Sequence, residues 1–356
     1  MEIFEIVNIF ALLMGLTFGA IAQKTQFCFS GSIKDYMLFS STRRGASVVM
    51  AMITAIVGTY LLTLVYEIDL SETVWLKEDV NYFTIILGGM LFGSGMVIAD
   101  GCSSRHLVKF AQGDNKSLVT VIFIAIFAFA SMKGVLSPIV LWLTTNEILM
   151  NLSSFVKNVQ LNIFVVLFVL LLILAVLTKK FKRVIELKDG FFIGLLVVGA
   201  WYLTGVYGAQ TLELDTRYVN FTAITFVGPS ARSLAMFTNW KINNLDFGIV
   251  LIFGVLIGAF IMSRFNRKYS FGCVSNIKMH KLTNSMAGGA LMGVGGVLAI
   301  GCTVGQGLSG LSTLAVASFV AIVSIFISGM ITASILNKKK QLPMCFVFEW
   351  NDEKKM

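Results

Sequence analysis

The stretch GGMLFGSGMVIADGC, Gly88–Cys102, recurs 200 positions later as GGALMGVGGVLAIGC, Gly288–Cys302. Nine of the fifteen positions are identical without a gap, which identifies an internal repeat. Each copy is an apolar run with closely spaced glycines, a pattern typical of membrane helices that pack tightly together. Each copy also ends in the dipeptide Gly-Cys. The sequence therefore predicts two equivalent helices, each of which delivers one thiol to its end.

The composition indicates a membrane protein. Hydrophobic residues make up 56% of the 356 residues, charged residues only 13%, and the mean hydropathy is +0.83. Soluble domains carry about 25% charged residues. The N-terminus, MEIFEIVNIF, has no basic residue before its first apolar run, which favours a first membrane helix over a cleaved signal peptide. The net charge of +9 lies in the segments between apolar runs, so we assign it to a membrane face and expect no nucleic-acid partner.

Nine membrane spans are predicted from apolar runs of suitable length. They cover residues 3–22, 45–66, 82–99, 117–132, 161–178, 190–207, 247–263, 285–300 and 313–336. One set of connecting loops, 23–44, 100–116, 179–189, 264–284 and the tail from Asn337, holds 22 of the 28 basic residues. The alternate set, which consists of the N-terminus and loops 67–81, 133–160, 208–246 and 301–312, holds the other six. The positive-inside rule then places the N-terminus outside and the C-terminus in the cytoplasm.

The two repeat copies lie on the third and eighth spans. Because these spans are an odd number apart, the copies run antiparallel across the membrane. We expect an all-α polytopic membrane protein in which nine helices form a 4+1+4 inverted repeat, an architecture used by transporters. A single transporter domain, 1–356, then divides into a first half (1–145), a connecting helix (161–178), a second half (190–336) and a cytoplasmic tail (337–356). GLTFGA, Gly15–Ala20, beside GLLVVGA, Gly194–Ala200, is a weaker echo of this duplication.

Two further segments are expected to be short re-entrant helices. QFCFSGSIKD, Gln26–Asp35, follows the first span, and FVGPSARSLAMF, Phe226–Phe237, follows the sixth, which is its counterpart in the repeat. Both are rich in small residues, and the apolar stretches beside them are too short to span. Irregular backbone at membrane depth is tolerated where it lines a cavity, and helix N-termini there present N–H groups to an anion.

Three of the five cysteines, Cys28, Cys102 and Cys302, lie at predicted helix ends or in small-residue loops. A thiol is a weak, polarisable donor that suits a sulfur atom better than a hard oxygen. Glycine before the thiol allows a substrate to approach the backbone. The segment after Cys302, TVGQGLSG, offers uncharged donors suited to an oxyanion. These features together predict a path for a small anion that contains sulfur or a chemical relative of it.

Each of these residues also has a structural interpretation. Buried cysteine often serves as a small hydrophobic side chain, and we regard Cys273 and Cys345 as incidental. Lys24 and Arg105 also fit the positive-inside pattern, and Asp100 is expected either to pair with Arg105 or to mark the interface. His106 and His280 are expected at the interface, because no cluster of metal-ligating residues accompanies them. Neither a metal nor another cofactor is expected.

The chain resembles the YeeE/YedE membrane proteins, most closely the YeeE-type thiosulfate transporters, over nearly its whole length. The resemblance is carried by KTQFCFSGSIKD (Lys24–Asp35), the two Gly-Cys segments, VGPSARSLAMF (Val227–Phe237) and GCTVGQGLSG (Gly301–Gly310). It implies a bacterial inner-membrane protein with nine spans and short re-entrant helices that takes up thiosulfate. It also implies a relay of transient S–H···S hydrogen bonds from Cys302 on the outer side through Cys28 to Cys102. Additional substrate-binding residues are assigned in Lys24, Gly101, Arg105, Ser230, Arg232, Gly301, Thr303 and Gln306.

The first motif departs from the family pattern, because Asp100 replaces a small residue and Arg105 replaces a glycine. The inner exit is therefore expected to bind its anion differently. The family also works beside soluble sulfur carriers of the TusA type, which suggests such a partner on the cytoplasmic side. An enzyme is not expected, and direct use of ATP is not expected because no phosphate-binding loop motif occurs. Transport of a selenium compound or another sulfur anion, a membrane sulfurtransferase that forms a cysteine persulfide, and a docking protein remain open alternatives.

Overall fold

The computed structural model describes residues 3–77, 80–145, 160–179, 187–213, 219–238, 245–270 and 281–343. Within these ranges the regular structure is helical, apart from one isolated bridge between Gln160 and Ala315. The first part of the chain forms α1 (Ile3–Thr25), α2 (Phe29–Phe39), α3 (Arg43–Tyr66), η1 (Leu70–Glu72), α4 (Tyr82–Ile98), α5 (Ser103–Ala111), α6 (Asn115–Lys133), α7 (Ser137–Thr145) and α9 (Ile163–Thr178). The second part forms α10 (Lys188–Tyr202), η3 (Leu203–Tyr207), α11 (Gly208–Glu213), α12 (Val227–Thr238), α13 (Phe247–Phe265), α14 (Leu282–Leu298), η5 (Gly305–Gly310) and α15 (Val316–Lys338).

Each of the nine predicted spans coincides with a helix. Seven helical segments within the described ranges are long and apolar enough to cross a membrane. They are Ile3–Phe39, Arg43–Tyr66, Tyr82–Ala111, Asn115–Lys133, Lys188–Thr211, Phe247–Phe265 and Val316–Lys338. The other two predicted spans are α9, with 16 residues, and α14, with 17. Their lengths of about 24–26 Å fall short of a hydrocarbon core of about 30 Å. The chain is a multi-pass, all-helical membrane protein.

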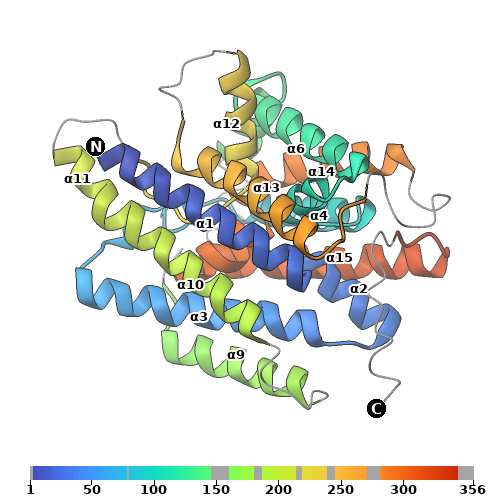
Figure 1. Ribbon diagram of the computed structural model, residues 1–356, viewed down its shortest axis with the longest axis horizontal. Coiled ribbons are helices and arrows are strands. Elements are labelled where there is room, and N and C mark those ends of the chain that lie inside the picture. The colour runs from blue at the N-terminus through green and yellow to red at the C-terminus, as the bar shows by residue number, and fades with distance from the viewer. Residues whose placement is uncertain are drawn as a thin grey trace.

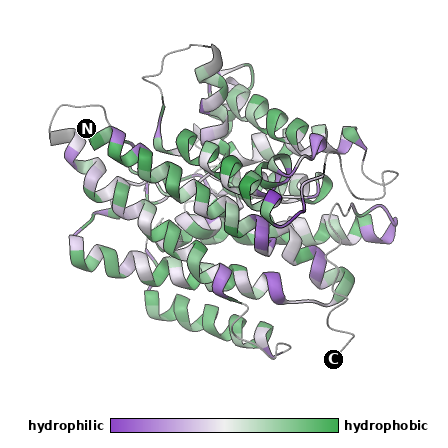
Figure 2. Ribbon diagram, in the orientation of Figure 1, coloured by the Kyte–Doolittle hydropathy of each residue, from purple (hydrophilic) through white to green (hydrophobic). Residues whose placement is uncertain are grey.

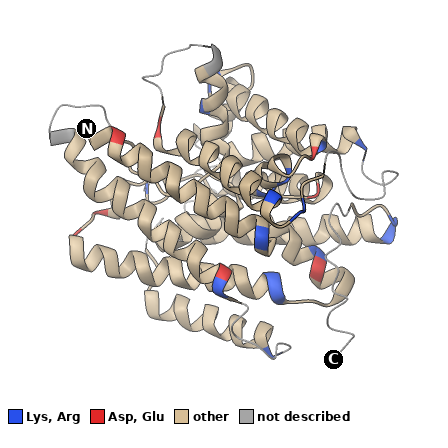
Figure 3. Cartoon of the chain, in the orientation of Figure 1, with Lys and Arg blue, Asp and Glu red and all other residues tan. Residues whose placement is uncertain are grey.

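Apolar and charged side chains are separated along the helix bundle. Hydrophobic residues make up most of the helices (Figure 2), and large apolar side chains such as Phe164, Val165 and Phe168 on α9 are exposed on the surface of the bundle. Most Lys and Arg residues lie toward the end of the bundle that holds α2 and the C-terminal end of α15, which is the right side of Figure 3. An apolar girdle with charges at its ends is the arrangement that a bilayer requires.

The helices contact one another in matched pairs. The central pair is α4 with α14, the two helices of the sequence repeat (Figure 1). Around it, α4 packs on α15 as α14 packs on α6, and α1 packs on α13 as α10 packs on α3. Each contact therefore has a counterpart in which the first four spans exchange roles with the last four. Such reciprocity is what an inverted repeat around a pseudo-two-fold axis produces.

The duplicated glycines form the contact between α4 and α14. A β-carbon on Gly88 would lie 2.7 Å from the carbonyl oxygen of Gly295, and one on Gly295 would lie 2.6 Å from that of Gly88. Gly95 and Gly288 form the same reciprocal pair, at 2.8 and 2.7 Å. Only glycine lets the two backbones approach so closely. The repeat therefore specifies the crossing of its own two helices.

The weaker echo in the sequence has an equivalent structural role. A β-carbon on Gly15 of α1 would lie 2.3 Å from the carbonyl oxygen of Leu251 on α13. One on Gly194 of α10 would lie 2.8 Å from the carbonyl oxygen of Ala51 on α3. In both halves, glycine brings the first long helix against the second long helix of the other half.

Two segments that the sequence analysis treats as loops are partly helical, which corrects that expectation. Residues 100–116 contain α5, and residues 301–312 contain the π-helix η5. Cys102 is the N-cap of α5, and the backbone N–H groups of His106 and Gln306 bond to the carbonyl oxygens of Cys102 and Cys302. A new helix thus begins immediately after each Gly-Cys turn. The two segments expected to be re-entrant begin the short helices α2 and α12.

Candidate functional site

Both repeat helices end in the same backbone turn. The N–H groups of Ala99 and Ala299 bond back to Gly95 and Gly295, each at 2.9 Å. Asp100 and Ile300 then adopt left-handed backbone angles, with φ of 68° and 55°. This reversal separates each repeat helix from the helix that follows it. The sulfur atom of each Gly-Cys dipeptide is consequently placed at the N-terminal end of a second helix.

The thiols of Cys302 and Cys102 are called outer and inner below, after the sides of the membrane that the sequence analysis predicts for them. Cys302 is fully buried beside small residues. Its Sγ accepts a hydrogen bond from the N–H of Gly305 at 3.3 Å. A β-carbon on Gly305 would lie 3.7 Å from that sulfur and 2.7 Å from Oγ1 of Thr225. Glycine at this position therefore brings the Thr225 hydroxyl close to the backbone beside the sulfur. The Thr303 side chain is buried, and its hydroxyl has no hydrogen-bond partner within the described residues.

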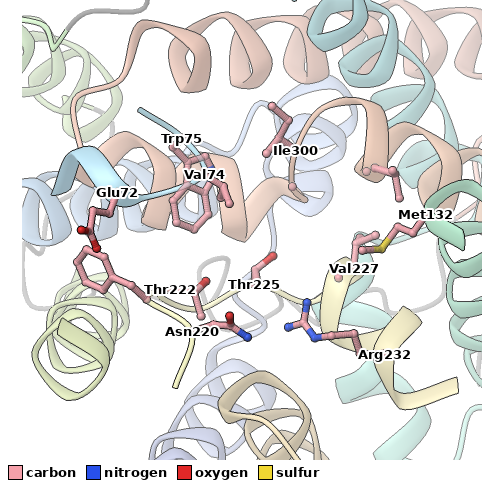
Figure 4. Close-up of a pocket in the computed structure, with 15 residues that line it drawn as sticks. Glu72, Val74, Trp75, Met132, Asn220, Thr222, Thr225, Val227, Arg232 and Ile300 are labelled. Atoms are coloured by element: carbon pink, nitrogen blue, oxygen red, sulfur yellow. The ribbon is translucent and has the colours of Figure 1, made fainter. Parts of the chain in front are cut away.

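A cavity of about 410 Å³ reaches this turn. Ile300 and Gly301 form part of its wall, opposite residues of the segment before α12 and the start of α12 itself. Figure 4 shows Thr225, Asn220 and Arg232 around its centre. One cation, Arg232, and several neutral polar side chains thus line this space together with the carboxylate of Glu72 and apolar residues. The cation and the neutral donors are groups that can bind a small oxyanion.

Two of the predicted substrate-binding residues, Ser230 and Arg232, lie on α12 and differ in how far their side chains can reach a bound anion. The Arg232 side chain is 40% exposed, lines the cavity and donates through Nε to Oδ2 of Asp246. Ser230 is buried, and its hydroxyl donates to the carbonyl oxygen of Phe226 at 2.7 Å. Arg232 can therefore present its charge to the cavity, while Ser230 stabilises the start of α12. The Gln306 side chain is also committed in part, because its Nε2 donates to the carbonyl oxygen of Ala299.

Cys28 lies at the start of α2, between the two Gly-Cys turns. Its Sγ caps the helix by accepting from the N–H of Gly31 at 3.3 Å. The ring of Phe29, the next residue, packs against Gly307 of η5, which follows the outer thiol. The Cys28 thiol also lies close to the Cys102 thiol. The structure thus brings Cys28 and Cys102 together and places Cys28 next to the helix that begins after Cys302.

The inner thiol, Cys102, is surrounded by polar groups. Its Sγ lies 3.3 Å from the hydroxyl of Ser104, and both residues are buried. Arg105 is also buried, at 4% exposure, and donates to Oε1 of Gln26 just before Cys28. Its burial shows that Arg105 is more than a surface charge of the positive-inside pattern. Lys24, by contrast, is exposed at the end of α1 and is not brought together with the other predicted residues.

Asp100 forms two buried ion pairs that the sequence analysis missed. Its carboxylate lies 2.6 Å from Nζ of Lys34 and 2.8 Å from Nζ of Lys109. Lys34 also donates to the carbonyl oxygen of Pro343, at 3.1 Å, so it ties α2 and the α4–α5 turn to the segment after α15. The expectation that Asp100 pairs with Arg105 or marks the interface did not include these lysines. The available signal was that the first copy of the repeat carries the carboxylate of Asp100 at the position where the second copy carries Ile300.

His106 is buried, which corrects the expectation of an interfacial side chain. It is 1% exposed, and its Nδ1 lies 3.0 Å from the hydroxyl of Ser117 on α6. His280, Cys273 and Cys345 lie outside the described residues. The buried polar groups at the inner turn thus form several connected clusters, whereas the outer turn is lined mainly by glycine and neutral side chains.

Comparison with known proteins agrees with this arrangement. The chain is 24% identical over 352 residues to the thiosulfate transporter TsuA of Spirochaeta thermophila, a match that covers 92% of this chain and 98% of that protein. It is 25% identical over 319 residues to the thiosulfate transporter TsuA of Escherichia coli, with coverage of 83% and 85%. A shorter match, 25% identical over 104 residues, relates 29% of the chain to 24% of the probable transporter YedE of Escherichia coli. The sequence model of the family described as Sulphur transport matches residues 24–332. Because that match spans most of the chain, the protein belongs to the sulphur transport family.

Proposed function

We propose that this protein imports thiosulfate across the bacterial inner membrane through a path built on Cys302, Cys28 and Cys102. The observation that carries the proposal is the pair of Gly-Cys turns with equivalent backbone, one beside an outer cavity and the other in contact with Cys28. The TsuA relatives are named as thiosulfate transporters, which supports thiosulfate as the substrate. In this proposal the protein is a transporter and performs no chemical conversion.

The path crosses the membrane between two inverted halves. Residues 1–145 and 190–336 form the halves, 161–178 connects them, and the tail from residue 337 is cytoplasmic. In this arrangement all nine long helices cross the bilayer, with the N-terminus outside. Support comes from the reciprocal helix contacts and from the basic residues at one end of the bundle. The shorter α9 and α14 are accommodated by local thinning of the bilayer and by burial within the protein, respectively.

In the proposed first step, the anion binds in the outer cavity. Arg232 attracts it, and Thr303, Gln306 and the backbone at Gly301 receive its oxygen atoms near the Cys302 thiol. An anion held by preorganised donors loses less on leaving water than one in an apolar site. Ser230 contributes by stabilising α12. Lys24, on the cytoplasmic face in this orientation, lies outside the path and adds positive charge near its exit.

In the following steps the terminal sulfur passes from thiol to thiol. Each S–H donates a weak hydrogen bond to it, so the anion is held at each station without being trapped. The buried Arg105 guanidinium compensates the negative charge as the anion moves from Cys28 to Cys102, and Gly101 allows it to approach the backbone. The anion then leaves on the cytoplasmic side, where a soluble sulfur carrier of the TusA type is the proposed acceptor.

The experiment that tests this function is uptake of labelled thiosulfate by proteoliposomes that contain only this protein. The parent should import the label, and Cys302→Ala should not. Cys345→Ala, which changes a thiol outside the proposed path, should import at the parent rate. No import by the parent would contradict the proposal, and the same vesicles would then be tested with selenium and other sulfur oxyanions. A stable persulfide on Cys102 after exposure to thiosulfate would instead favour a sulfurtransferase.

A further inference from the structure

A buried chain of three polar side chains lies behind the inner Gly-Cys turn. Nδ1 of His106 on α5 lies 3.0 Å from Oγ of Ser117 on α6. That hydroxyl donates to Oδ2 of Asp114, at the N-cap of α6, over 2.6 Å. The three residues are 1%, 1% and 4% exposed. An ionisable chain of this kind inside a membrane protein is typical of a proton relay.

The hydrogen bonds in this chain all point in one direction. A serine hydroxyl carries one proton, and an ionised carboxylate only accepts. Because Ser117 gives its proton to Asp114, its oxygen must accept from His106. Nδ1 therefore carries the imidazole proton, and Nε2 is the proton-accepting atom of the neutral ring. A proton added at Nε2 can be balanced by the Nδ1 proton leaving toward Ser117.

The accepting end of the chain faces the proposed path. A β-carbon on Gly101 would lie 3.3 Å from Nε2 of His106. His106 also follows Cys102 by one helical turn, because its backbone N–H bonds to the Cys102 carbonyl oxygen at 3.0 Å. The other end, Asp114, lies at the turn between α5 and α6, on the cytoplasmic side in the proposed orientation. The chain thus leads from the last thiol toward the cytoplasm.

The ionisable groups around His106 come from the Gly-Cys turn and from five helices. The preceding turn and α5 contribute Asp100, Arg105 and Lys109, which are buried with it. Lys116 joins Asp114 on α6, and Lys34 of α2 reaches the cluster through Asp100. On the other two elements packed against α5, the ends of α13 and α1, the cations Arg264 and Lys24 are exposed. Buried cations and the carboxylates of Asp100 and Asp114 thus lie together around the His106 side chain.

The corresponding position in the second half is not ionisable. Gln306 occupies it, and its side-chain amide donates to the carbonyl oxygen of Ala299. The repeat therefore offers a substitute residue that this backbone already accommodates. It also confines the relay to the inner turn.

We propose that the His106–Ser117–Asp114 chain delivers a proton to the cytoplasm with each imported anion, so that the proton gradient drives uptake. This inference rests on the proposed function, because an anion moving toward a negative interior needs a driving ion. The proton comes from external water and travels bound to the anion, which enters in its monoprotonated form and releases the proton at the inner turn. Nε2 accepts it, the Nδ1 proton passes to Ser117, and the Ser117 proton passes to Asp114. Asp114 releases a proton to the cytoplasm, and reversal of the ring tautomer restores the chain.

The test measures uptake of labelled thiosulfate and entry of protons in the same proteoliposomes. Labelled thiosulfate is added to the external solution, and a pH-sensitive dye is enclosed in the vesicles. Thiosulfate should acidify the interior of vesicles that contain the parent. Lowering the external pH by one unit should raise accumulation about tenfold for each coupled proton. His106→Gln, which copies Gln306, should keep downhill uptake but lose both responses. Import of label by the parent without proton entry would overturn the relay and leave the proposed function intact. Failure of the parent to import label would overturn both.

A pair of variants at Ser117 tests the relay even if His106→Gln fails to fold. Ser117→Thr keeps the hydroxyl and should remain coupled, whereas Ser117→Ala should import label without acidification. A role for Ser117 confined to stabilising the α5–α6 contact would change expression or stability but not the number of protons per anion. Proton coupling at the parent ratio in Ser117→Ala would also overturn the relay.

Discussion

The inner and outer Gly-Cys turns share a backbone but differ in chemistry. Both reverse the chain through a left-handed residue and place a thiol at the start of a new helix. The first copy carries Asp100, Arg105, His106 and Lys109 where the second carries Ile300, Gly305, Gln306 and Ser309. A duplicated backbone thus supports a neutral, donor-rich turn beside the outer cavity and a buried ionic cluster at the inner turn. The difference shows that the two turns surround their thiols with different side chains, while the duplicated glycines specify the crossing of the two repeat helices.

The largest expected effect comes from removing the charge that is unique to the inner turn. Asp100→Asn leaves Lys34 and Lys109 buried without their carboxylate, which should lower the free energy of unfolding by about 3–5 kcal/mol. Unfolding in mixed micelles, followed by tryptophan fluorescence, measures this loss. The triple variant Asp100→Ile, Lys34→Met, Lys109→Ser removes both ammonium groups and should recover most of it. A single variant as stable as the parent would show that these ion pairs contribute little.

The next largest effect is expected from the glycines that the two repeat helices, α4 and α14, share. Gly88→Ala and Gly288→Ala should each lower the free energy of unfolding by about 1–3 kcal/mol. A β-carbon on Gly88 would lie 2.4 Å from the backbone nitrogen of Ala299, and one on Gly288 would lie 2.6 Å from Cβ of Ala99. Gly199→Ala is the matched control, since its nearest neighbour would be Met14 Cε at 3.4 Å. Its stability should stay within about 0.5 kcal/mol of the parent. Unequal losses at Gly88 and Gly288 would contradict the reciprocal role of the two glycines.

These predictions separate what the sequence reveals from what only the fold reveals. Apolar runs predict the positions of the seven long helical segments and of the shorter helices α9 and α14, and the repeat predicts the equivalence of the two turns. Helix α5 was missed because its polar residues suggested a basic loop. The ion pair between Lys34 and Asp100, in the turn before α5, joins residues 66 positions apart, and the sequence offers no local signal for it. The apolar positions Leu107, Val108 and Ala111 were the available hint of a helix.

The thiols were easier to predict than the groups around them. Their position at the ends of a repeat marks Cys102 and Cys302, and both are fully buried. The contact between His106 and Ser117 depends instead on how α5 folds back on α6. The sequence shows an aspartate three residues before a serine, which is an ordinary signal for a helix start. Nothing in that pattern indicates a histidine partner.

A smaller effect is expected at the left-handed residue of the outer turn. A β-branched side chain is unfavourable at a φ of 55°, and Ile300 has no charged partner of the kind that stabilises Asp100. Ile300→Gly should therefore raise the free energy of unfolding by up to about 1 kcal/mol. Asp100→Gly should lower it, because the ion pairs are lost. Equal signs for the two variants, measured in the same micelles, would contradict the contrast between the turns.

The smallest effect on stability is expected at Thr303. Its hydroxyl is buried without a hydrogen-bond partner in the described part of the chain, so Thr303→Val should change stability by less than about 0.5 kcal/mol. A hydrogen bond to a charged group contributes about 1.5 kcal/mol or more, so the apparent affinity for thiosulfate should fall roughly tenfold. Initial uptake rates at several concentrations give that affinity. Unchanged affinity would remove Thr303 from the outer binding site.

The central claim is that the two equivalent turns are successive stations of one path. The most direct test compares binding and passage of labelled thiosulfate in Cys302→Ala and Cys102→Ala proteins, with equilibrium binding in detergent and uptake in proteoliposomes. Cys302→Ala should lose both binding and uptake, whereas Cys102→Ala should still bind the anion at the outer turn but fail to import it. Import by Cys102→Ala at the parent rate would contradict the account.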